Sequence, residues 1–201
     1  MRRLTLALLL VGAVPSSVLS AQSTGTPVFA APYRAFQRSE AGISLSDPVG
    51  GGVGLEGFYR IGSHAWDIGF RGGFDAPNGN ANTALLLGVD GRTRVLTHDE
   101  GFPLDGALTL GFGGRFVSGG SELLIPVGLS MGRRLDLEGS NISFVPYVQP
   151  VLTPVFASGN SHLDFTLGLG VDMRVSRRVD LRVAGGIGDL DGVSVSVAFI
   201  H

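Results

Sequence analysis

The sequence SHLD, residues 161–164, combines side chains that could act as a base and an orienting group in acyl-chain chemistry. In an extended strand His162 and Asp164 lie on one face, whereas Ser161 points to the opposite face. A nucleophile would therefore have to come from elsewhere, from Ser118 or Ser121. The simpler interpretation is a histidine near a strand end, hydrogen-bonded to its neighbour.

Four other motifs resemble functional sites but fit poorly with their surroundings. GVGLEG at 52–57 resembles a dinucleotide fingerprint, which must open a helix, yet strand-like alternation continues to Ile61. GLSMG around Ser130 resembles a nucleophile elbow but lies within a similar alternation. DLDG at 189–192 and HDE at 98–100 are explained better as solvated turns than as ligand sets. We therefore expect no catalytic residue, no cofactor and no metal site.

The N-terminus has the pattern of a secretory signal peptide. Two arginines precede a short apolar run, and Pro15 and small residues follow it, which predicts a cleaved segment over 1–21 with cleavage after Ser20 or Ala21. Residues 22–40 have no clear period and are expected to form a periplasmic linker. The absence of cysteine excludes a lipoprotein anchor and disulfides, and no basic patch suggests nucleic acid.

The elements that must position these residues are strands. Residues 162–175 alternate apolar and polar side chains almost without fault, and glycine is unusually abundant without a collagen-like period. Similar segments, separated by turn-forming residues, cover 41–46, 51–62, 65–75, 83–95, 104–117, 122–134, 142–156, 162–175, 179–187 and 192–201. The fold class is therefore all-β, a closed antiparallel up-and-down barrel of ten strands over 41–201. Merging the weak strands would give eight.

The charges of these strands fall on one face. That polar face carries Glu56, Arg60, Asp67, Arg71, Asp90, Arg92, Arg94, Asp105, Arg115, Glu122, Arg134, Asp164, Asp172, Arg174, Asp180 and Arg182. Its other residues are small, every basic residue is arginine, and aromatic residues lie near strand ends, all of which favour a charged lumen and a lipid-facing apolar wall. The alternative is a soluble barrel or sandwich with the faces reversed.

Two segments resemble the small outer-membrane β-barrels of Gram-negative bacteria, the OmpA-, OmpX- and OmpW-like group. FYRIGSHAWDIGF resembles their tight periplasmic turn, and GVSVSVAFIH resembles the C-terminal strand that their barrel assembly machinery recognises. That signal normally ends in an aromatic residue. Here His201 is last, and Phe199 shares its parity. The resemblance implies an integral outer-membrane protein with a periplasmic C-terminus, a monomer in contact with outer-membrane lipid.

Pro146, Pro150 and Pro154 share one parity, so the N–H that each lacks would have faced the same neighbouring strand. Local bulges or rescue by water and hydroxyl groups would satisfy the affected carbonyls. The sharper hypothesis is a lateral seam for apolar molecules, bordering either the sixth or the eighth strand.

Three functions therefore stand open. The first is a non-catalytic barrel whose lumen is filled by salt bridges and which has a structural role in the membrane. The second is a lateral conduit or binder for small apolar molecules, and the third is a lipid-modifying barrel enzyme.

Overall fold

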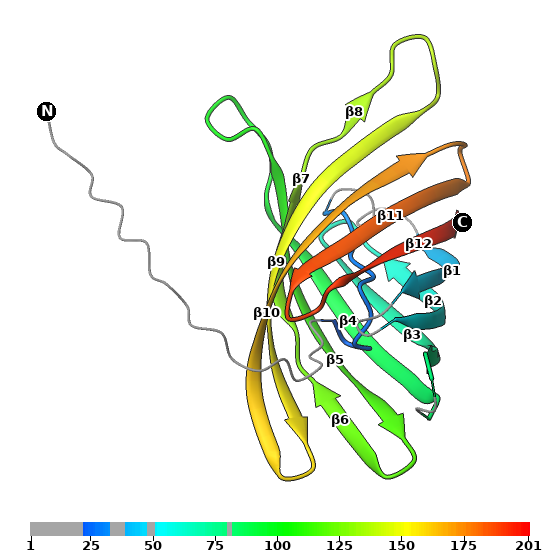
Figure 1. Cartoon of the computed structure of the whole chain (residues 1–201). Helices are drawn as coiled ribbons and strands as arrows, with labels where there is room; N and C mark the ends of the chain where they lie inside the picture. Colours follow the sequence, from blue (N-terminus) through cyan, green and yellow to red (C-terminus); the bar gives the residue numbers. More distant parts are fainter. Residues whose placement is uncertain (1–21, 33–38, 48–50, 80–81) are drawn as a thin grey trace, which may run out of the picture.

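The chain folds as a closed antiparallel β-barrel of ten strands, as the alternation predicts (Figure 1). The structure is a computed structural model that describes residues 22–32, 39–47, 51–79 and 82–201, so the expected signal peptide lies outside the described residues. Within these ranges no helix is long and apolar enough to cross a membrane. The barrel is closed by antiparallel pairing of the first and last strands, from Glu40 opposite Ile200 to Asp47 opposite Val193.

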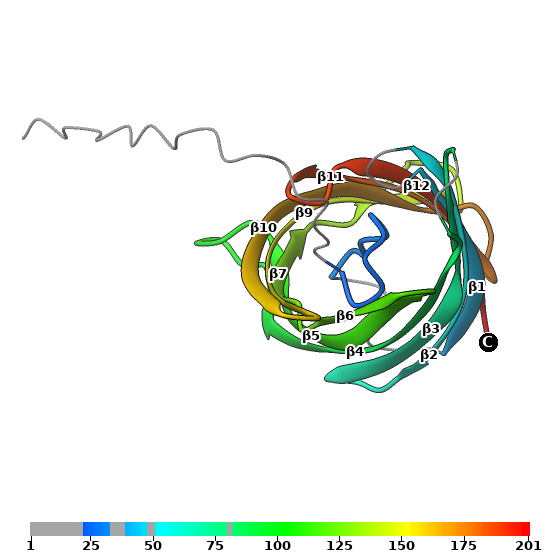
Figure 2. The same cartoon turned by 60° about the horizontal axis from the view of Figure 1, so that its bottom comes forward.

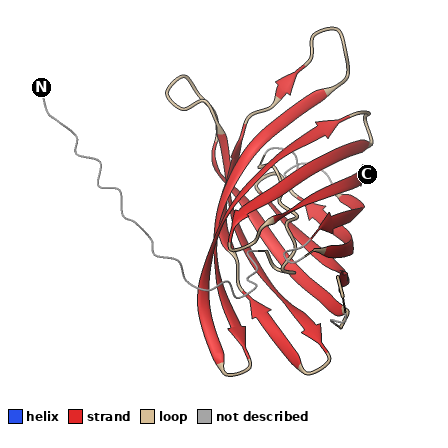
Figure 3. Cartoon of the chain, in the orientation of Figure 1, coloured by secondary structure: helices blue, strands red, loops and turns tan. Residues whose placement is uncertain are grey.

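Twelve strand segments form the ten strands, because the sixth strand is interrupted. The segments are β1 (Glu40–Asp47), β2 (Gly52–Gly62), β3 (Trp66–Pro77), β4 (Ala84–Leu96), β5 (Asp105–Val117), β6 (Gly120–Leu124), β7 (Val127–Gly132), β8 (Leu135–Asp136), β9 (Ser143–Ala157), β10 (Asn160–Arg174), β11 (Val179–Gly188) and β12 (Gly192–Ile200). Figure 3 shows that strands make up nearly the whole wall and that loops connect successive strands.

The interruption of the sixth strand lies at Ile125 and Pro126, between β6 and β7. Proline has no N–H to donate, so it breaks the ladder locally. Two backbone bonds bridge the break: Ile125 N donates to Pro154 O at 3.1 Å, and Gly111 N donates to Pro126 O at 2.8 Å. Both β6 and β7 therefore still pair with β5 on one side and β9 on the other.

The apolar side chains face outward and the charges face inward, as predicted. Phe70 and Val183 are 51% and 56% exposed, whereas Glu56 and Asp180 are 1% and 0% exposed. A row of large apolar side chains on the outside of a closed barrel is the arrangement that a membrane requires, because lipid favours apolar contact. The reversed, soluble arrangement is excluded by this orientation.

The inner face of β9 differs from this rule. Val145, Tyr147 and Val151 point into the lumen and are buried. They belong to one apolar cluster with Ala184, Leu190 and two residues of the N-terminal segment, Phe29 and Ala31. The lumen is therefore polar around most of its circumference but carries an apolar strip beside that segment.

Residues 22–32 occupy the lumen instead of forming a linker outside the barrel. Figure 2 shows this segment enclosed by the strands. Most of its residues are buried, including Val28 and Phe29 at 8% and 2% exposure. The lack of a strand period correctly indicates irregular structure, but burial of Phe29 and Ala31 against β9 draws the segment inside. We refer to residues 22–32 as the plug.

Candidate functional site: the barrel lumen

Arg60 of β2 is the centre of the luminal ion-pair network. Its guanidinium pairs with Asp67 of β3, lies 2.5 Å from Asp90 Oδ2 of β4 and is 3.8 Å from Glu40 Oε1 of β1. Arg92 of β4 adds a second contact to Asp67, with Nε 3.1 Å from Oδ1. Four neighbouring strands are thus joined by side chains inside the wall.

Glu40 of β1 connects this group to β11 and β10, on the other side of the junction between the first and last strands. Arg182 of β11 binds both oxygens of Glu40, at 3.0 and 2.5 Å, and its Nε lies 3.3 Å from Asp172 Oδ2 of β10. Arg174 similarly binds both oxygens of Asp180, at 3.0 and 3.3 Å. Bidentate pairing of this kind is what the fixed fork of arginine favours.

The sequence-based set missed Glu40 and Asp75. Glu40 falls in the expected linker, one residue before the expected strand, although it has the inward parity of Ser44. Asp75 is 3% exposed and accepts a bond from Arg115 Nη2 at 2.8 Å. It lies beside a turn-rich segment. Asp75 lies inside the expected strand 65–75 with the parity of Asp67 and Arg71, so parity alone identifies it, whereas Glu40 is identified once the expected strand 41–46 begins one residue earlier.

Most of the predicted charges take the expected positions. Arg71 lies 3.6 Å from Glu56, Asp105 accepts from the His98 backbone N at 3.0 Å, and Glu122 is opposite Arg115 in the register of β5 and β6. Arg94 is exposed near the end of β4. The prediction was wrong for Arg134, which lies beyond β7 and pairs with exposed Asp136 at 2.7 Å, because the strand ends at Gly132.

The plug is held mainly through its backbone. Four barrel side chains donate to plug carbonyls: Arg71 Nη1 to Val28 O at 3.3 Å, Arg92 Nη1 to Ala31 O at 3.0 Å, Ser130 Oγ to Ala30 O at 2.7 Å and Ser194 Oγ to Pro27 O at 2.8 Å. Gln149 Oε1 accepts from Ala30 N at 3.4 Å. One side-chain bond, from the Thr26 hydroxyl to Glu56, completes the contact with the wall. These bonds satisfy backbone groups that the lumen removes from bulk water.

Luminal glycines make room for the plug. A Cβ added to Gly168 would collide with the Phe29 ring, and a Cβ at Gly113 would collide with Ser23 O. A Cβ at Gly88 would lie 2.7 Å from Ser23 Oγ and 3.1 Å from Ser23 Cβ. The glycines on β4, β5 and β10 are thus needed for close approach of the plug to the wall.

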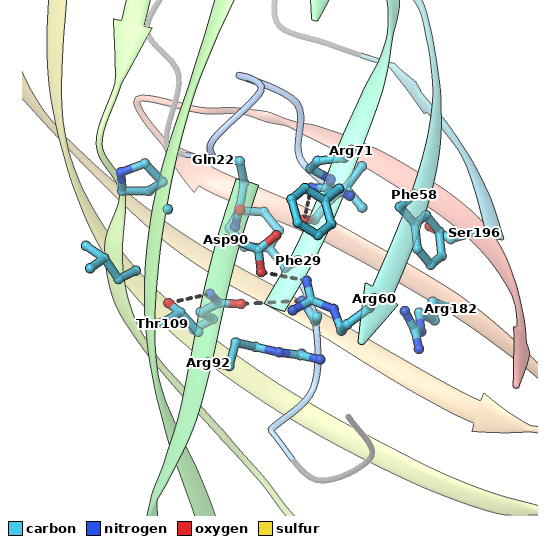
Figure 4. Close-up of a pocket in the computed structure, with 18 of the residues that line it drawn as sticks. Gln22, Phe29, Phe58, Arg60, Arg71, Asp90, Arg92, Thr109, Arg182 and Ser196 are labelled. Atoms are coloured by element: carbon cyan, nitrogen blue, oxygen red, sulfur yellow. Dashed lines mark hydrogen bonds and ion pairs between the residues drawn. The ribbon is translucent and has the colours of Figure 1, made fainter. Parts of the chain in front are cut away.

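A small cavity of about 40 Å³ remains between the plug and the network. Figure 4 shows Arg60, Asp90 and Arg92 around it, with Phe29 of the plug on one side. A water molecule needs at least about 10–15 Å³ of such volume, so this space fits a few waters. Side chains and the plug fill the middle of the lumen.

The residues singled out for chemistry have structural contacts in the described part of the chain. Ser130 is fully buried and donates to the plug, and residues 52–57 lie within β2. His162 Nε2 is 3.4 Å from Asp164 Oδ1, but Ser118 and Ser121 lie at the β5–β6 hairpin, separated from β10 by β9. Asp189 Oδ2 accepts from Phe165 N at 2.7 Å as part of a turn. No group of three metal-ligating side chains occurs among these described residues.

The proline row faces the sixth strand. The backbone of Pro154 points toward β6, because its oxygen accepts from Ile125 N, and Pro150 and Pro146 have the same parity. The constant register places Leu129 opposite Pro150 and Arg133 opposite Pro146. The carbonyls of Ile125, Leu129 and Arg133 therefore receive no N–H from these prolines. The β9–β10 register, by contrast, is unbroken from Ala157 to Ser143.

The C-terminal residue takes part in the aromatic contacts at its end of the barrel. His201 stacks on Tyr59 of β2 with ring centroids 5.7 Å apart, and its Nε2 lies 3.3 Å from the Tyr59 hydroxyl. Phe199, the other residue of the predicted assembly signal, is 57% exposed on the outer face.

Comparison with solved structures agrees with this architecture. The chain is similar to the β-domain of the Bordetella autotransporter BrkA, with 13% identity, a TM-score of 0.51 and coverage of 81% of this chain and 98% of that one. It is also similar to a barrel from the de novo design of transmembrane β-barrels, with 15% identity, a TM-score of 0.41 and coverage of 83% and 97%. No family model and no curated protein matches. The fold is that of a transmembrane β-barrel whose lumen contains buried salt bridges.

Proposed function

We propose that this chain is a non-catalytic integral protein of the bacterial outer membrane, with a structural role there. In this proposal the segment 1–21 is a signal peptide that is removed during export, and the barrel belongs with the small OmpA-, OmpX- and OmpW-like proteins. Its partners are outer-membrane lipid and, during biogenesis, the barrel assembly machinery. It functions as a monomer without a cofactor and without nucleic acid.

The observation that carries the proposal is the filled lumen. Glu40, Arg60 and Arg182 form one network of paired charges across the interior, and the plug occupies the space beside it. A buried charge that loses its partner is costly, so this network resists rearrangement. Ion pairs that fill the interior stabilise the barrel wall and leave no open path for transport.

The test has two parts. Membrane fractionation should recover the protein with the outer membrane, in a form that migrates differently on a gel before and after boiling. The purified protein in a planar bilayer should give no large, stable single-channel conductance. Steady conductance of the unmodified protein would contradict the proposal.

The second candidate function is a lateral site for apolar molecules, and an outer groove beside the interrupted strand favours it. The groove has a volume of about 660 Å³, and the outward residues Trp66, Ile68, Val89, Leu110 and Ile125 line it around Gly91. It includes Ile125, whose carbonyl faces Pro154 in the proline row. The groove and the weakened seam between the sixth strand and β9 therefore meet.

The single tryptophan offers a direct test of this second function. Because Trp66 lines the groove, a brominated fatty acid bound there should quench its fluorescence more than the same probe does in a Gly91→Leu variant, whose added side chain fills the groove. Equal quenching in both proteins would exclude the groove as a binding site.

A further inference from the structure

We propose that the plug is displaceable and that the barrel without it conducts small inorganic cations. This goes beyond the structural role, because it gives the same molecule a closed state, which the structure presents, and an open state. The proposal rests on how the plug is bound, on what its removal leaves behind and on the charge of the surface it covers.

The side chains of the plug carry no charge. Residues 22–32 contain no ionisable side chain, and the barrel holds them mostly through carbonyls such as those of Pro27 and Ala30. The net contribution of each such hydrogen bond to stability is modest, since water replaces it when the segment leaves. The apolar contact of Phe29 with Gly168 and the β9 cluster is the main additional anchor.

Removal of the plug leaves the ion pairs of the wall intact. Arg71 loses the contact with Val28 but keeps Glu56, and Arg92 loses the contact with Ala31 but keeps Asp67. The network that ties β1 to β4, β10 and β11 includes no plug residue. The wall is thus able to persist while the plug is out, because no buried charge is left without its partner.

Glycines of the wall lie at several points where the plug makes its closest contacts. Gly88 and Gly113 lie against Ser23, and Gly168 lies against Phe29. When the plug leaves, these positions expose bare backbone, so the lumen gains width along the path that the plug occupied (Figure 2). A ten-stranded barrel is wider than the eight-stranded kind that side chains alone fill.

The exposed lumen favours cations. Its inward-facing carboxylates are Glu40, Glu56, Asp67, Asp75, Asp90, Asp105, Glu122, Asp164, Asp172 and Asp180, whereas its inward-facing arginines, apart from Arg94 at the strand end, are Arg60, Arg71, Arg92, Arg115, Arg174 and Arg182. Most of these are paired, but the excess is negative. A pore lined by net negative charge admits cations in preference to anions.

The experiment first weakens the binding of the plug to the wall and then ties the plug to the wall covalently. Phe29→Ala removes the apolar anchor, and Gly168→Leu fills the space that the Phe29 ring occupies without changing the plug itself. In planar bilayers with potassium chloride, both variants should show at least tenfold more open-channel time than the unmodified protein. In a salt gradient their reversal potential should indicate selectivity for potassium over chloride.

A disulfide between the plug and the wall then shows whether movement of the plug opens the channel. The chain has no cysteine, so Ser23→Cys with Gly88→Cys introduces a single pair. The 3.1 Å between the Cβ positions lies close to the about 3.5–4.5 Å of a disulfide, within a small shift. Added to the Phe29→Ala variant, this pair should close the channel when oxidised and reopen it when reduced, whereas either single cysteine should have no such effect.

Several results would overturn the proposal. The first is that Phe29→Ala and Gly168→Leu barrels, shown to be folded by their heat-dependent gel mobility, do not conduct. The second is that the channels stay open after oxidation of the cysteine pair. The third is that the channels are selective for chloride.

If both weakened variants fail to fold, the proposal is tested with the otherwise native barrel that carries the reduced cysteine pair. The thiol introduced by Gly88→Cys lies beneath the plug, so it should react with a water-soluble thiol reagent only when the plug leaves. No reaction there would also overturn the proposal. Steady conductance of the otherwise native barrel with the reduced cysteine pair, abolished when the pair is oxidised, would contradict the structural role while supporting the plug.

Discussion

At the scale of single residues, the contribution of an ion pair to the stability of this protein depends on whether the pair is buried in the lumen or exposed. Arg182 is 7% exposed and serves two carboxylates, Glu40 and Asp172, whereas Arg134 is exposed and pairs with Asp136 outside the lumen. Burial removes the competing solvation by water, so the loss of one partner leaves an uncompensated charge only in the first case.

Arg182→Met should therefore destabilise the barrel by about 3–5 kcal/mol in urea unfolding from lipid vesicles. Arg134→Met is the matched control and should change stability by about 0–1 kcal/mol. Adding Glu40→Gln to Arg182→Met should recover part of the loss, because it removes one unpaired charge. Similar losses for the two single variants would show that the luminal network is not desolvated.

A second residue-scale prediction concerns the outer face. Val183 lies in the middle of β11 with 56% of its surface exposed, so Val183→Arg would place a charge in lipid at an expected cost of about 2–4 kcal/mol. Val183→Leu should leave the stability nearly unchanged. Unfolding from vesicles measures both, and an unaffected arginine variant would mean that this face does not contact hydrocarbon.

At the scale of elements, β9 is bonded unequally to its two neighbours. Its register with β10 is continuous, whereas Pro146, Pro150 and Pro154 remove alternate donors from the side facing the sixth strand. Pro126 interrupts that strand as well. Pro126, however, faces β5, because its oxygen accepts from Gly111 N, so the seam between the sixth strand and β9 is weakened by the three prolines of β9.

Pro150→Val should restore a donor opposite the Leu129 carbonyl and stabilise the barrel by about 0.5–1.5 kcal/mol. The amide of Leu129, which faces Pro150, should then exchange more slowly with solvent, while amides of β10 keep their rate. Leu152→Val changes the same face of the same strand without adding a donor, and it should slow no amide. Unchanged exchange at Leu129 after Pro150→Val would mean that its carbonyl already has another partner.

At the scale of the whole molecule, stability depends on closure. The pairing of β1 with β12 leaves no free sheet edge in the described barrel, and an open edge in lipid would expose unpaired backbone groups. The ion-pair network, through Glu40 and Arg182, reinforces the same closure from inside.

Truncation after Asp191 should therefore abolish the compact, heat-sensitive species on a gel and leave the chain open to trypsin, because β1 and β11 lose their common partner. Removal of His201 alone costs the stack on Tyr59 but keeps every residue of β12, so that protein should still close. A compact species from the long truncation would show that the remaining strands close by another pairing.

The sequence by itself determined the strands, their faces and the class of fold. A period of two assigns each side chain to one of two faces, and sixteen charges confined to one face distinguish the lumen from the lipid side without any knowledge of contacts. Even so, the same period wrongly places Arg134 inside, because alternation continues past Gly132, where the strand ends.

Only the tertiary structure decided how the lumen is filled and which seam is weak. Parity shows that the prolines share one neighbour, but a contact between Ile125 and Pro154 was needed to identify it as the sixth strand. Likewise the plug has no periodic pattern, so its position depends on non-local contacts: Phe29 packs over Gly168 and Val28 bonds to Arg71. Local patterns encode which way a residue points, whereas the partner it meets across the barrel depends on closure of the whole chain.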